Sequence, residues 1–536
     1  MEQEGTVGET AHPPGPNPAS DDPGRRQGAI AGGHVSASEM RRDESAEGTR
    51  DRGDLYRHTK IIATLGPATQ SEEMLGKLIS SGVDVVRLNM AHGTSQWVAE
   101  VVARIRSVSE RIGRHVAVMM DVKGPEIRTG PVEQPIELAA GDVVEFYTDQ
   151  ASDQPHRAST ESPKTRVSVN YRDLPHNVAV GATVLVDSGL LRLEILDKDQ
   201  TSIRCRVITP GTLGSRRHIN LPGVEVNLPA LTEKDQNDLR AGIQAGIDFV
   251  ALSFVRQADD VKTLRRFLDD CGSRARIISK IEEQAGVRNM DAIIRESDGV
   301  MVARGDLGIE IDYHRLPLVQ TQLVRACQAE GKPVIIATHL LESMITCPFP
   351  TRAEISDVSN AVREQADAVM LSGETTTGAY PLESVDVLQQ IIASIEPTVS
   401  RTLNSRIELK DPKAIMLRSS AILAQELGES DPEHGSGIVV FTRSGFLPYV
   451  LGALRPRGVP IFAFTDDEPT FHQLLLPWGV EPFFMQFSDD PEQTIRDALG
   501  TLCSNGWCVP GAWLAVITNV LAGGRIVDTL QLRQVH

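Results

Sequence analysis

The stretch RIISKIEEQAGV, residues 276–287, shows how this chain is built. Ile277, Ile278 and Ile281 indicate a short buried β-strand, and Lys280 and Glu282 stand at its end. Side chains two positions apart on a strand point to the same face of a sheet. A cation and an anion are therefore expected side by side where the strand ends. They form either a simple salt bridge or a pair that holds a ligand between them.

The same unit of apolar strand, polar turn and amphipathic helix recurs along the chain from residue 60. The strands are nearly continuous apolar runs, which is typical of parallel strands covered by helices. Eight such units in series predict an α/β fold with a closed (β/α)8 TIM barrel rather than an open sheet. The predicted strands cover residues 61–65, 84–89, 116–121, 248–253, 276–281, 299–303, 333–337 and 368–372.

Three further regions differ from the barrel in composition. Residues 1–56 are rich in Gly, Pro, Ser and mixed charge, so we expect a disordered tail. Residues 125–220 alternate short apolar and polar segments, which predicts a small antiparallel β-barrel domain inserted after the third strand, where it can act as a lid. The barrel then comprises residues 57–124 and 221–395, and residues 396–536 are expected to form a C-terminal α/β domain. Its predicted strands cover residues 437–442, 459–465, 480–485 and 513–518.

The overall charge limits the classes of partner. The 536 residues carry a formal net charge of −18, whereas binding to nucleic acid or to an anionic membrane needs a basic face. No apolar run approaches the roughly 20 residues of a membrane span, and the N-terminus lacks the apolar core of an export signal. The six cysteines are scattered without a paired spacing, so a reduced cytoplasmic setting is expected.

Polar side chains gather at the carboxyl ends of the predicted strands, where TIM barrels carry their active sites. The opposite strand ends are bland by comparison, so one rim is the predicted active site. The polar residues on this rim include Arg87, Asn89, His92, Asp121, Lys123, Glu126, Arg128, Ser253, Lys280, Glu282, Arg304, Asp306, Thr338, His339, Ser372 and Glu374.

The residue types on this rim indicate a metal–phosphate site. Glu282 and Asp306 are hard oxygen ligands on adjacent strands, and two carboxylates with substrate oxygens and water are the usual way to hold Mg²⁺. Arg87 and Lys280 can bind a phosphate and stabilise charge on a phosphoryl group during transfer. The glycines of ARGDLG, residues 303–308, let backbone N–H groups approach an anion closely. These groups favour Mg²⁺-assisted phosphoryl transfer.

Each of these residues also has a plain structural interpretation. Lys280 and Glu282 alone could form a surface ion pair, and His92 could be a structural histidine. Isolated carboxylates at strand ends are commonly helix N-caps. Residues 304–306 match an adhesion tripeptide, which does not fit a cytoplasmic barrel. The convergence of many such residues on one rim favours the functional interpretation.

Longer motifs resemble those of the pyruvate kinase family, continuously from about residue 57 to 396 and more weakly beyond. They are RLNMAHG (87–93), DVKGPEIRTG (121–130), INLPG (219–223), ISKIE (278–282), MVARGDLGIEI (301–311), ATHLLESM (337–344), PTRAEISDVSNAV (350–362) and LSGET (371–375). The resemblance implies a barrel, a β-barrel lid, a C-terminal α/β domain and a homotetramer. It also implies the last step of glycolysis: the phosphoryl group of phosphoenolpyruvate passes to ADP, giving ATP and pyruvate, with Mg²⁺ or Mn²⁺ and with K⁺ as cofactors.

The resemblance further implies roles for individual residues. Lys280 would stabilise the transition state and then the enolate, and the Thr338 hydroxyl would lie on a proton path to the enolate, with water as an alternative donor. The catalytic residues would be Lys280, Arg87 and Thr338, and the substrate would be bound by Arg87, Lys280, Gly305, Asp306 and Thr338. The nucleotide would be faced by Asn89, His92, Arg128 and Arg217. The Mg²⁺ ligands would be Glu282 and Asp306, and the K⁺ ligands would be Asn89, Asp121 and the Val122 carbonyl.

Three departures from the family pattern bear on function. Ala91 stands where the family has a serine whose hydroxyl helps to ligate K⁺, so we expect weak, altered or absent K⁺ activation. Arg217 stands where lysine is usual, which keeps the charge but changes the geometry. Phe446 and Leu447 replace residues that help to bind a sugar phosphate, so control by fructose bisphosphate is not expected. Thr442, Arg443 and Ser444 remain as anion contacts.

Two other functions stay open. A Mg²⁺-dependent lyase or aldolase acting on a pyruvate enolate would use the same kind of barrel, but it would need neither the nucleotide-facing residues nor the lid. A non-catalytic or regulatory relative of the kinase would be favoured by loss of Lys280, Glu282 or Asp306, and all three are present.

Overall fold

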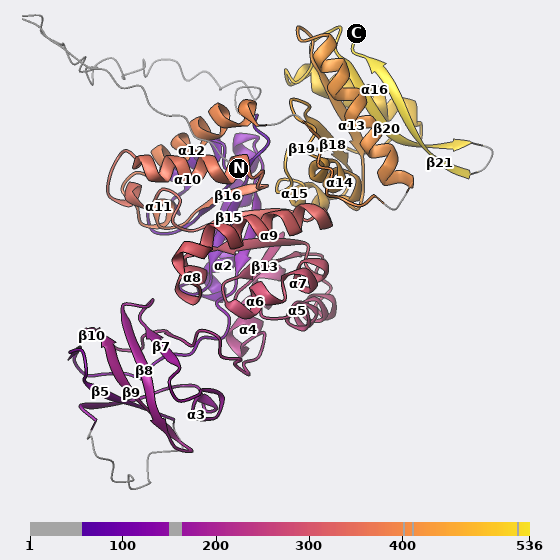
Figure 1. The fold of residues 1–536 in the computed structure, drawn as a ribbon. Helices are drawn as coiled ribbons and strands as arrows, with labels where there is room; N and C mark the ends of the chain where they lie inside the picture. The colour runs from indigo at the N-terminus through magenta and orange to yellow at the C-terminus, as the bar shows by residue number, and fades with distance from the viewer. Residues whose placement is uncertain (1–55, 149–162, 400–401, 410–411, 523–524) are drawn as a thin grey trace, which may run out of the picture. The chain divides into compact units, whose positions relative to one another are not determined.

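The computed structural model describes residues 56–148, 163–399, 402–409, 412–522 and 525–536. The tail predicted as disordered, residues 1–56, lies outside these residues apart from Tyr56. The described residues contain a closed barrel, sheets inserted between two of its strands, and a C-terminal sheet (Figure 1). The domain boundaries given above remain predictions.

The eight predicted strands are present and close into a parallel barrel. Around the ring they follow chain order, and each is buried along nearly all of its length, which explains the near-continuous apolar runs. The strands are β1 (Lys60–Thr64), β2 (Val85–Asn89), β3 (Ala117–Asp121), β12 (Phe249–Leu252), β13 (Arg276–Ile281), β14 (Gly299–Ala303), β15 (Val334–Ala337) and β16 (Ala368–Leu371).

Alternate strand residues face opposite sides of the barrel wall. Ile62, Met119 and Phe249 belong to the cluster that fills the interior, whereas Ile61 and Val86 pack with the surrounding helices. The outer helices are α1 (Glu72–Ser80), α2 (Ser95–Ile112), α4 (Glu233–Ala245), α5 (Ala258–Asp270), α7 (Met290–Glu296), α9 (Leu316–Glu330), α10 (Arg352–Arg363) and α12 (Pro381–Ile395). The short helices α6 (Gln284–Arg288), α8 (Arg304–Glu310) and α11 (Gly373–Thr376) follow strands at the carboxyl rim.

The inserted domain forms a half-barrel with its own apolar core. One sheet has the order β11-β7-β8-β9-β5-β6, and β10 pairs with β4. The prediction of antiparallel pairing is wrong for one pair, because β5 and β6 run parallel. The strands are β4 (Ile136–Leu138), β5 (Val143–Tyr147), β6 (Thr165–Ser168), β7 (Thr183–Val186), β8 (Leu191–Lys198), β9 (Ser202–Thr209), β10 (Gly211–Leu213) and β11 (Ile219–Asn220), with the short helix α3 (Leu174–Asn177).

The C-terminal domain is the predicted α/β sheet with one additional strand. Its order is β19-β18-β17-β20-β21, and the last strand is antiparallel to its neighbour and was not predicted. The strands are β17 (Ser436–Phe441), β18 (Ile461–Thr465), β19 (Val480–Phe484), β20 (Trp513–Ala522) and β21 (Arg525–Gln534), and the helices are α13 (Pro412–Ser430), α14 (Phe446–Leu454), α15 (Glu468–Gln473) and α16 (Pro491–Ser504).

Four aspartates link neighbouring strands at the amino end of the barrel, so the expectation that this end is bland is wrong. Each directly precedes a strand, and its carboxylate accepts a hydrogen bond of 2.6 to 3.0 Å from a backbone N–H of the neighbouring strand. The aspartates therefore occur on every second strand of the ring. Their ion-pair partners are Arg57 for Asp84, Arg106 for Asp248, Arg265 for Asp298 and Arg455 for Asp367.

Two of these aspartates also contact the C-terminal domain. Asp367 lies 2.7 Å from Arg455 and accepts the backbone N–H of Trp478 at 3.1 Å. Asp248 lies 3.7 Å from the ring of His472. Leu475 and Leu476 of the same domain pack among the side chains of the barrel interior. The C-terminal domain therefore covers the end of the barrel opposite to the predicted active site.

Glu396 holds the segment that leads into β1. Its carboxylate accepts the backbone N–H groups of His58 at 3.1 Å and Thr59 at 2.7 Å. Burial would raise the pKa of Glu396, but the hydrogen bonds from His58 and Thr59 outweigh burial and lower the pKa from 4.5 to about 2. The stability that this carboxylate contributes is therefore present above pH 4.5 and is lost as the pH falls toward 2, by roughly 3 kcal/mol in all.

Replacing Glu396 by glutamine should therefore flatten the pH dependence of stability. Chemical denaturation at pH 6 and pH 3 should give a smaller difference in unfolding free energy for Glu396→Gln than for the wild type. Glu133→Gln is the control, because Glu133 is exposed. A Glu396→Gln protein with the wild-type pH dependence would contradict this account.

Candidate active site

Lys280 is the centre of a buried polar cluster at the carboxyl rim. Its ammonium lies 2.9 Å from Glu282 Oε1 and 3.1 Å from Asp121 Oδ1, and it donates a hydrogen bond to Ser253 Oγ at 2.8 Å. Only 8% of Lys280 is exposed. The partners come from the ends of three neighbouring strands, β3, β12 and β13, so the cluster depends on the assembled barrel. The two side chains singled out in the sequence are thus in contact, within a larger network.

Arg87 joins the cluster through Asp121. Its guanidinium contacts Asp121 Oδ2 at 2.6 and 2.7 Å and donates to Thr64 Oγ1 at 3.0 Å. Burial would raise the pKa of Asp121, but Lys280 and Arg87 outweigh burial and hold the pKa below its ordinary value. Burial would lower the pKa of Lys280, but Asp121 and Glu282 raise it above its ordinary value. Lys280 therefore stays charged at neutral pH.

Glu282 and Asp306 have the chemistry of a divalent-cation site. Glu282 is 1% exposed and accepts the backbone N–H of Phe254 at 2.7 Å. Burial raises the pKa of Glu282 to about 7; Lys280 opposes this rise, whereas Asp306 and Asp121 add to it. A cation beside these carboxylates would relieve their repulsion. Within the described residues no three His, Cys, Asp or Glu are grouped for a metal, so substrate and water oxygens would have to complete the coordination.

The turn after β15 is strained and is held against the start of α8. The Gly305 N–H donates to Thr338 Oγ1 at 2.8 Å, and the Thr338 hydroxyl donates to the Ala337 carbonyl at 2.7 Å. Thr338 and His339 have φ angles of +62° and +54°, in the left-handed region that such residues seldom adopt. The buried Arg304 guanidinium donates to the carbonyls of residues 337–339. Backbone strain of this kind is concentrated at functional sites.

Arg128 and Arg217, two of the four residues predicted to face the nucleotide, pair with carboxylates outside this cluster. The Arg128 side chain pairs with Glu126 at 2.7 Å, and the Arg217 side chain pairs with Asp187 at 3.4 Å. His92 is exposed in the turn before α2. Their roles toward a nucleotide remain predictions.

The oxygens predicted to bind K⁺ lie in one region of the rim. Asn89 stands opposite Asp121 in the register of β2 and β3, and its Oδ1 accepts the N–H of Ala91 at 3.1 Å. The Val122 carbonyl accepts the hydroxyl of Ser253 at 2.6 Å. All three predicted oxygen sources therefore already have hydrogen-bond partners, and Ala91 brings no hydroxyl to the region.

Ser253, Thr64 and Arg304 contact the candidate site, although no role was predicted for them from the sequence. Ser253 contacts Lys280, and Thr64 contacts Arg87, while Arg304 supports the turn after β15. Their positions at the ends of strands were visible in the sequence. The partners that give them a role depend on the register between strands.

The anion contacts predicted in the C-terminal domain line a separate cavity of about 440 Å³. Arg443 there makes a two-pronged ion pair with Asp466, at 2.6 and 2.9 Å, so its charge is already compensated. The residues singled out in the sequence that line this cavity are Thr442, Arg443, Ser444, Phe446 and Leu447.

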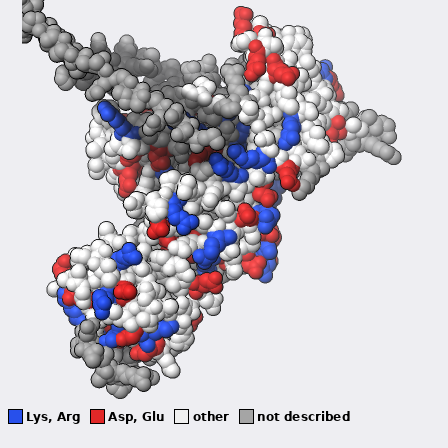
Figure 2. Space-filling view, in the orientation of Figure 1, with Lys and Arg blue, Asp and Glu red and all other residues white. Residues whose placement is uncertain are grey.

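The surface and the cysteines bear on partners and compartment. On the face shown in Figure 2, Lys and Arg side chains are interspersed with Asp and Glu. None of the helices in the described parts of the chain is both long enough and apolar enough to cross a membrane. All six cysteines are free thiols.

Comparison with known proteins finds related sequences over most of the chain. The family "Pyruvate kinase, barrel domain" matches residues 56–385, and "Pyruvate kinase, alpha/beta domain" matches residues 432–532. The chain is 37% identical to plastidial pyruvate kinase 2 of Arabidopsis thaliana, over 92% of this chain and 83% of that protein. It is 38% identical to a pyruvate kinase of Dictyostelium discoideum, over 87% and 92%, and 41% identical to one of Bacillus licheniformis, over 79% and 71%.

Proposed function

The chain belongs to the pyruvate kinase family, and from this premise we propose how the rim of its barrel moves a phosphoryl group from phosphoenolpyruvate to ADP. In this reaction the P–O bond of phosphoenolpyruvate breaks, a new P–O bond forms to the terminal phosphate of ADP, and the enolate that remains takes a proton at C3. The observation that carries the proposal is the buried cluster of Lys280, Arg87, Asp121 and Glu282.

The two cations of the cluster supply positive charge where the phosphoryl group passes. Lys280 acts as a fixed cation rather than as a base, since its pKa is raised by Asp121 and Glu282 although burial would lower it. Arg87 is held in place by Asp121 and Thr64 and presents a planar fork suited to phosphoryl oxygens. Charge held ready in a buried site stabilises the transition state and then the enolate without reorganisation.

Glu282 and Asp306 would hold the divalent cation, Mg²⁺ or Mn²⁺. When bound, the cation supplies neutralising charge to the phosphoryl and enolate oxygens. The backbone N–H groups at Gly305 and Asp306, with the Thr338 hydroxyl, would bind the substrate carboxylate at the start of α8. Thr338 could then pass a proton toward C3, with water as the alternative donor.

The nucleotide side of the reaction is assigned to Asn89, His92, Arg128 and Arg217. Closure of the inserted domain would bring Arg128 and Arg217 toward the phosphates of ADP and exclude water. We also propose a cytoplasmic homotetramer, which rests on the family resemblance and, for the compartment, on six free cysteines.

The direct test is pyruvate formation by the purified protein from phosphoenolpyruvate, ADP and Mg²⁺. Pyruvate that depends on ADP supports the proposal, and loss of activity with a chelator supports the metal. A folded protein that forms no pyruvate, with sugar-phosphate and nucleotide effectors also tried, would favour the non-catalytic function.

Activation by K⁺ should be weak or absent in the wild type and stronger in Ala91→Ser. The serine hydroxyl would add an oxygen beside Asn89 and Asp121, where Ala91 now offers none. The measurement is the ratio of kcat with K⁺ to kcat without K⁺, with Na⁺ at equal ionic strength as the control. A wild-type ratio well above one and as large as that of Ala91→Ser would show that the remaining oxygens and water hold the ion, and ratios near one in both proteins would show that the serine hydroxyl does not restore the site.

A further inference from the structure

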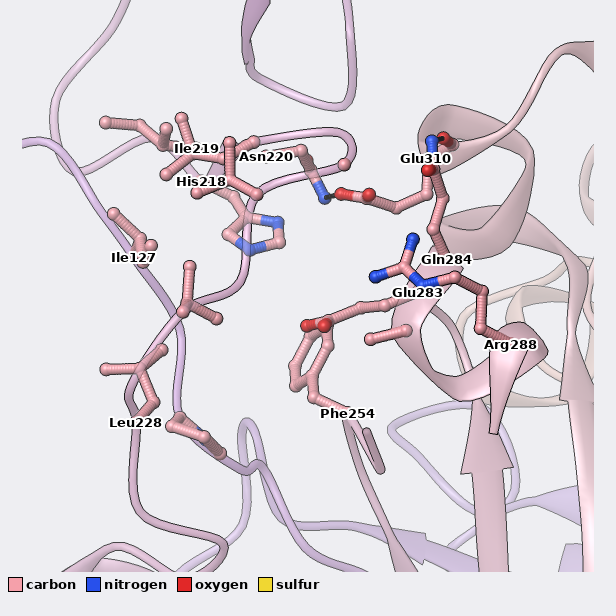
Figure 3. Close-up of a pocket in the computed structure, with 16 residues that line it drawn as sticks. Ile127, His218, Ile219, Asn220, Leu228, Phe254, Glu283, Gln284, Arg288 and Glu310 are labelled. Atoms are coloured by element: carbon pink, nitrogen blue, oxygen red, sulfur yellow. Dashed lines mark hydrogen bonds between the residues drawn. The ribbon is translucent and has the colours of Figure 1, made fainter. Parts of the chain in front are cut away.

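A buried hydrogen bond joins the inserted domain to the barrel. Asn220, in the last strand of the inserted domain, donates from Nδ2 to Glu310 Oε1 at 2.9 Å. Both side chains are buried, with 5% and 7% exposed. Figure 3 shows them pointing toward each other across a pocket whose wall includes Ile127, Leu228 and Phe254.

Glu310 connects this bond to both predicted metal ligands. It is the last residue of α8, the helix whose first turn carries Gly305 and Asp306. Its backbone carbonyl accepts the side chain of Gln284 at 2.5 Å. Gln284 begins α6, two residues after Glu282. The segments that carry Glu282 and Asp306 therefore meet at the residue that Asn220 holds.

The chain that returns from the inserted domain contacts both the barrel and the inserted domain. Arg256, on the barrel, donates to the carbonyls of Val226 at 3.0 Å and Leu228 at 2.5 Å. Between this anchor and Asn220 lies a turn in which Gly223 has a φ of +77°. Val226 and Leu228 also pack against the core of the inserted domain, and the Asn227 N–H donates to the Tyr171 hydroxyl of that domain at 3.0 Å. Rotation of the inserted domain would therefore strain this segment as well as the bond between Asn220 and Glu310.

Breaking the hydrogen bond between Asn220 and Glu310 is unfavourable for both side chains, because each would leave a buried polar group without a partner. Asn220 Oδ1 is buried and has no partner within the described residues, so the bond to Glu310 is the one hydrogen bond that its side chain makes there. Glu310 would keep a buried carboxylate oxygen without its donor. The pair therefore favours one position of the inserted domain relative to α8.

We propose that Asn220 and Glu310 form a latch that couples the position of the inserted domain to the placement of Gly305 and Asp306. This inference rests on the proposed function, in which those two residues bind the substrate carboxylate and the divalent cation. Asn220 and Glu310 are positioning residues: they act through α8 and touch no reacting atom.

The test breaks the latch and then rebuilds it with reversed polarity. Asn220→Asp places a carboxylate against Glu310, and Asn220→Leu removes the donor without adding charge. In the double variant Asn220→Asp with Glu310→Gln, the glutamine amide can donate to the aspartate and restore the bond. Asn227→Asp is the matched control, because Asn227 lies in the same returning segment and is exposed.

We expect both single variants at position 220 to lower kcat/KM for ADP by about 10- to 100-fold and to raise the Mg²⁺ concentration needed for half-maximal rate. The double variant should recover most of both losses, and Asn227→Asp should match the wild type. Amide hydrogen exchange over residues 219–228 and α8 should be faster in the single variants and restored in the double variant.

The latch is overturned if the position-220 variants keep the wild-type Mg²⁺ dependence, or if the double variant is no better than Asn220→Asp. Hydrogen exchange separates the latch from the proposed function, because it needs no turnover. If the wild type forms no pyruvate, faster amide exchange in the single variants that returns to the wild-type rate in the double variant still supports the latch. Exchange rates that are the same in all variants overturn it.

Discussion

Lys280→Met should lower kcat for pyruvate formation by about 10³- to 10⁵-fold, with a much smaller change in KM for phosphoenolpyruvate. Methionine keeps the apolar stem of Lys280 but removes the ammonium that lies 2.9 Å from Glu282 and 3.1 Å from Asp121. The loss should fall on kcat because this charge is needed most while the phosphoryl group is in transfer and the enolate forms.

Two controls separate this chemical effect from a change in folding. Lys280→Met leaves the buried carboxylates with less compensating charge, so its unfolding should be measured with and without Mg²⁺ alongside activity. Lys77→Met removes an exposed lysine that pairs with Glu73 and should leave kcat unchanged. A folded Lys280→Met protein that keeps nearly all of its activity would show that the role assigned to Lys280 is wrong.

The barrel could be predicted because its signal is local. A strand such as RIISKI is buried on both faces, so Ile277, Ile278 and Ile281 form an apolar run that needs no knowledge of neighbours. The rim predicted to be active follows from strand direction alone, since parallel strands place all their carboxyl ends together. Lys280 and Glu282 could thus be assigned to the candidate site before any contact was known.

What could not be predicted depends on register or lacks an apolar run. Ser253 reaches Lys280 because Leu252 pairs with Ser279, and a slip by one residue would turn its side chain away. β5 and β6 are consecutive in the chain, and an alternation of apolar and polar residues does not show whether two such strands pair parallel or antiparallel. The edge strand β21 was not predicted because it is partly exposed: Val527 and Leu532 are 43% and 44% exposed. Its sequence therefore lacks the apolar run that marks a buried strand.

The four aspartates at the amino end of the barrel also show what can and what cannot be predicted from the sequence. The sequence repeats the pattern of an aspartate followed by a strand at VDVV, IDFV, SDGV and ADAV, yet only the assembled ring shows that each carboxylate binds the strand beside it. Asp298 serves the barrel in this way, whereas Asp367 also holds the C-terminal domain. Substitutions at Asp367 and Asp298 can therefore be compared to measure how much the contact with the C-terminal domain contributes to the free energy of unfolding.

Asp367→Ala should destabilise the protein by about 3–5 kcal/mol, since it leaves Arg455 buried without its counter-charge. Arg455 is 1% exposed, and the Trp478 backbone N–H would lose its acceptor in the same change.

The matched control is Asp298→Ala, which removes an equivalent acceptor from the barrel, although its partner Arg265 keeps a side chain 35% exposed to water. Denaturant unfolding followed by tryptophan fluorescence should show a larger fall in midpoint for Asp367→Ala than for Asp298→Ala. Because Trp478 stacks on His58 between the two domains, its signal should change first in Asp367→Ala. Equal destabilisation by the two substitutions would mean that these aspartates stabilise the barrel alone and that the C-terminal domain is held by its apolar contacts, Leu475 and Leu476 among them.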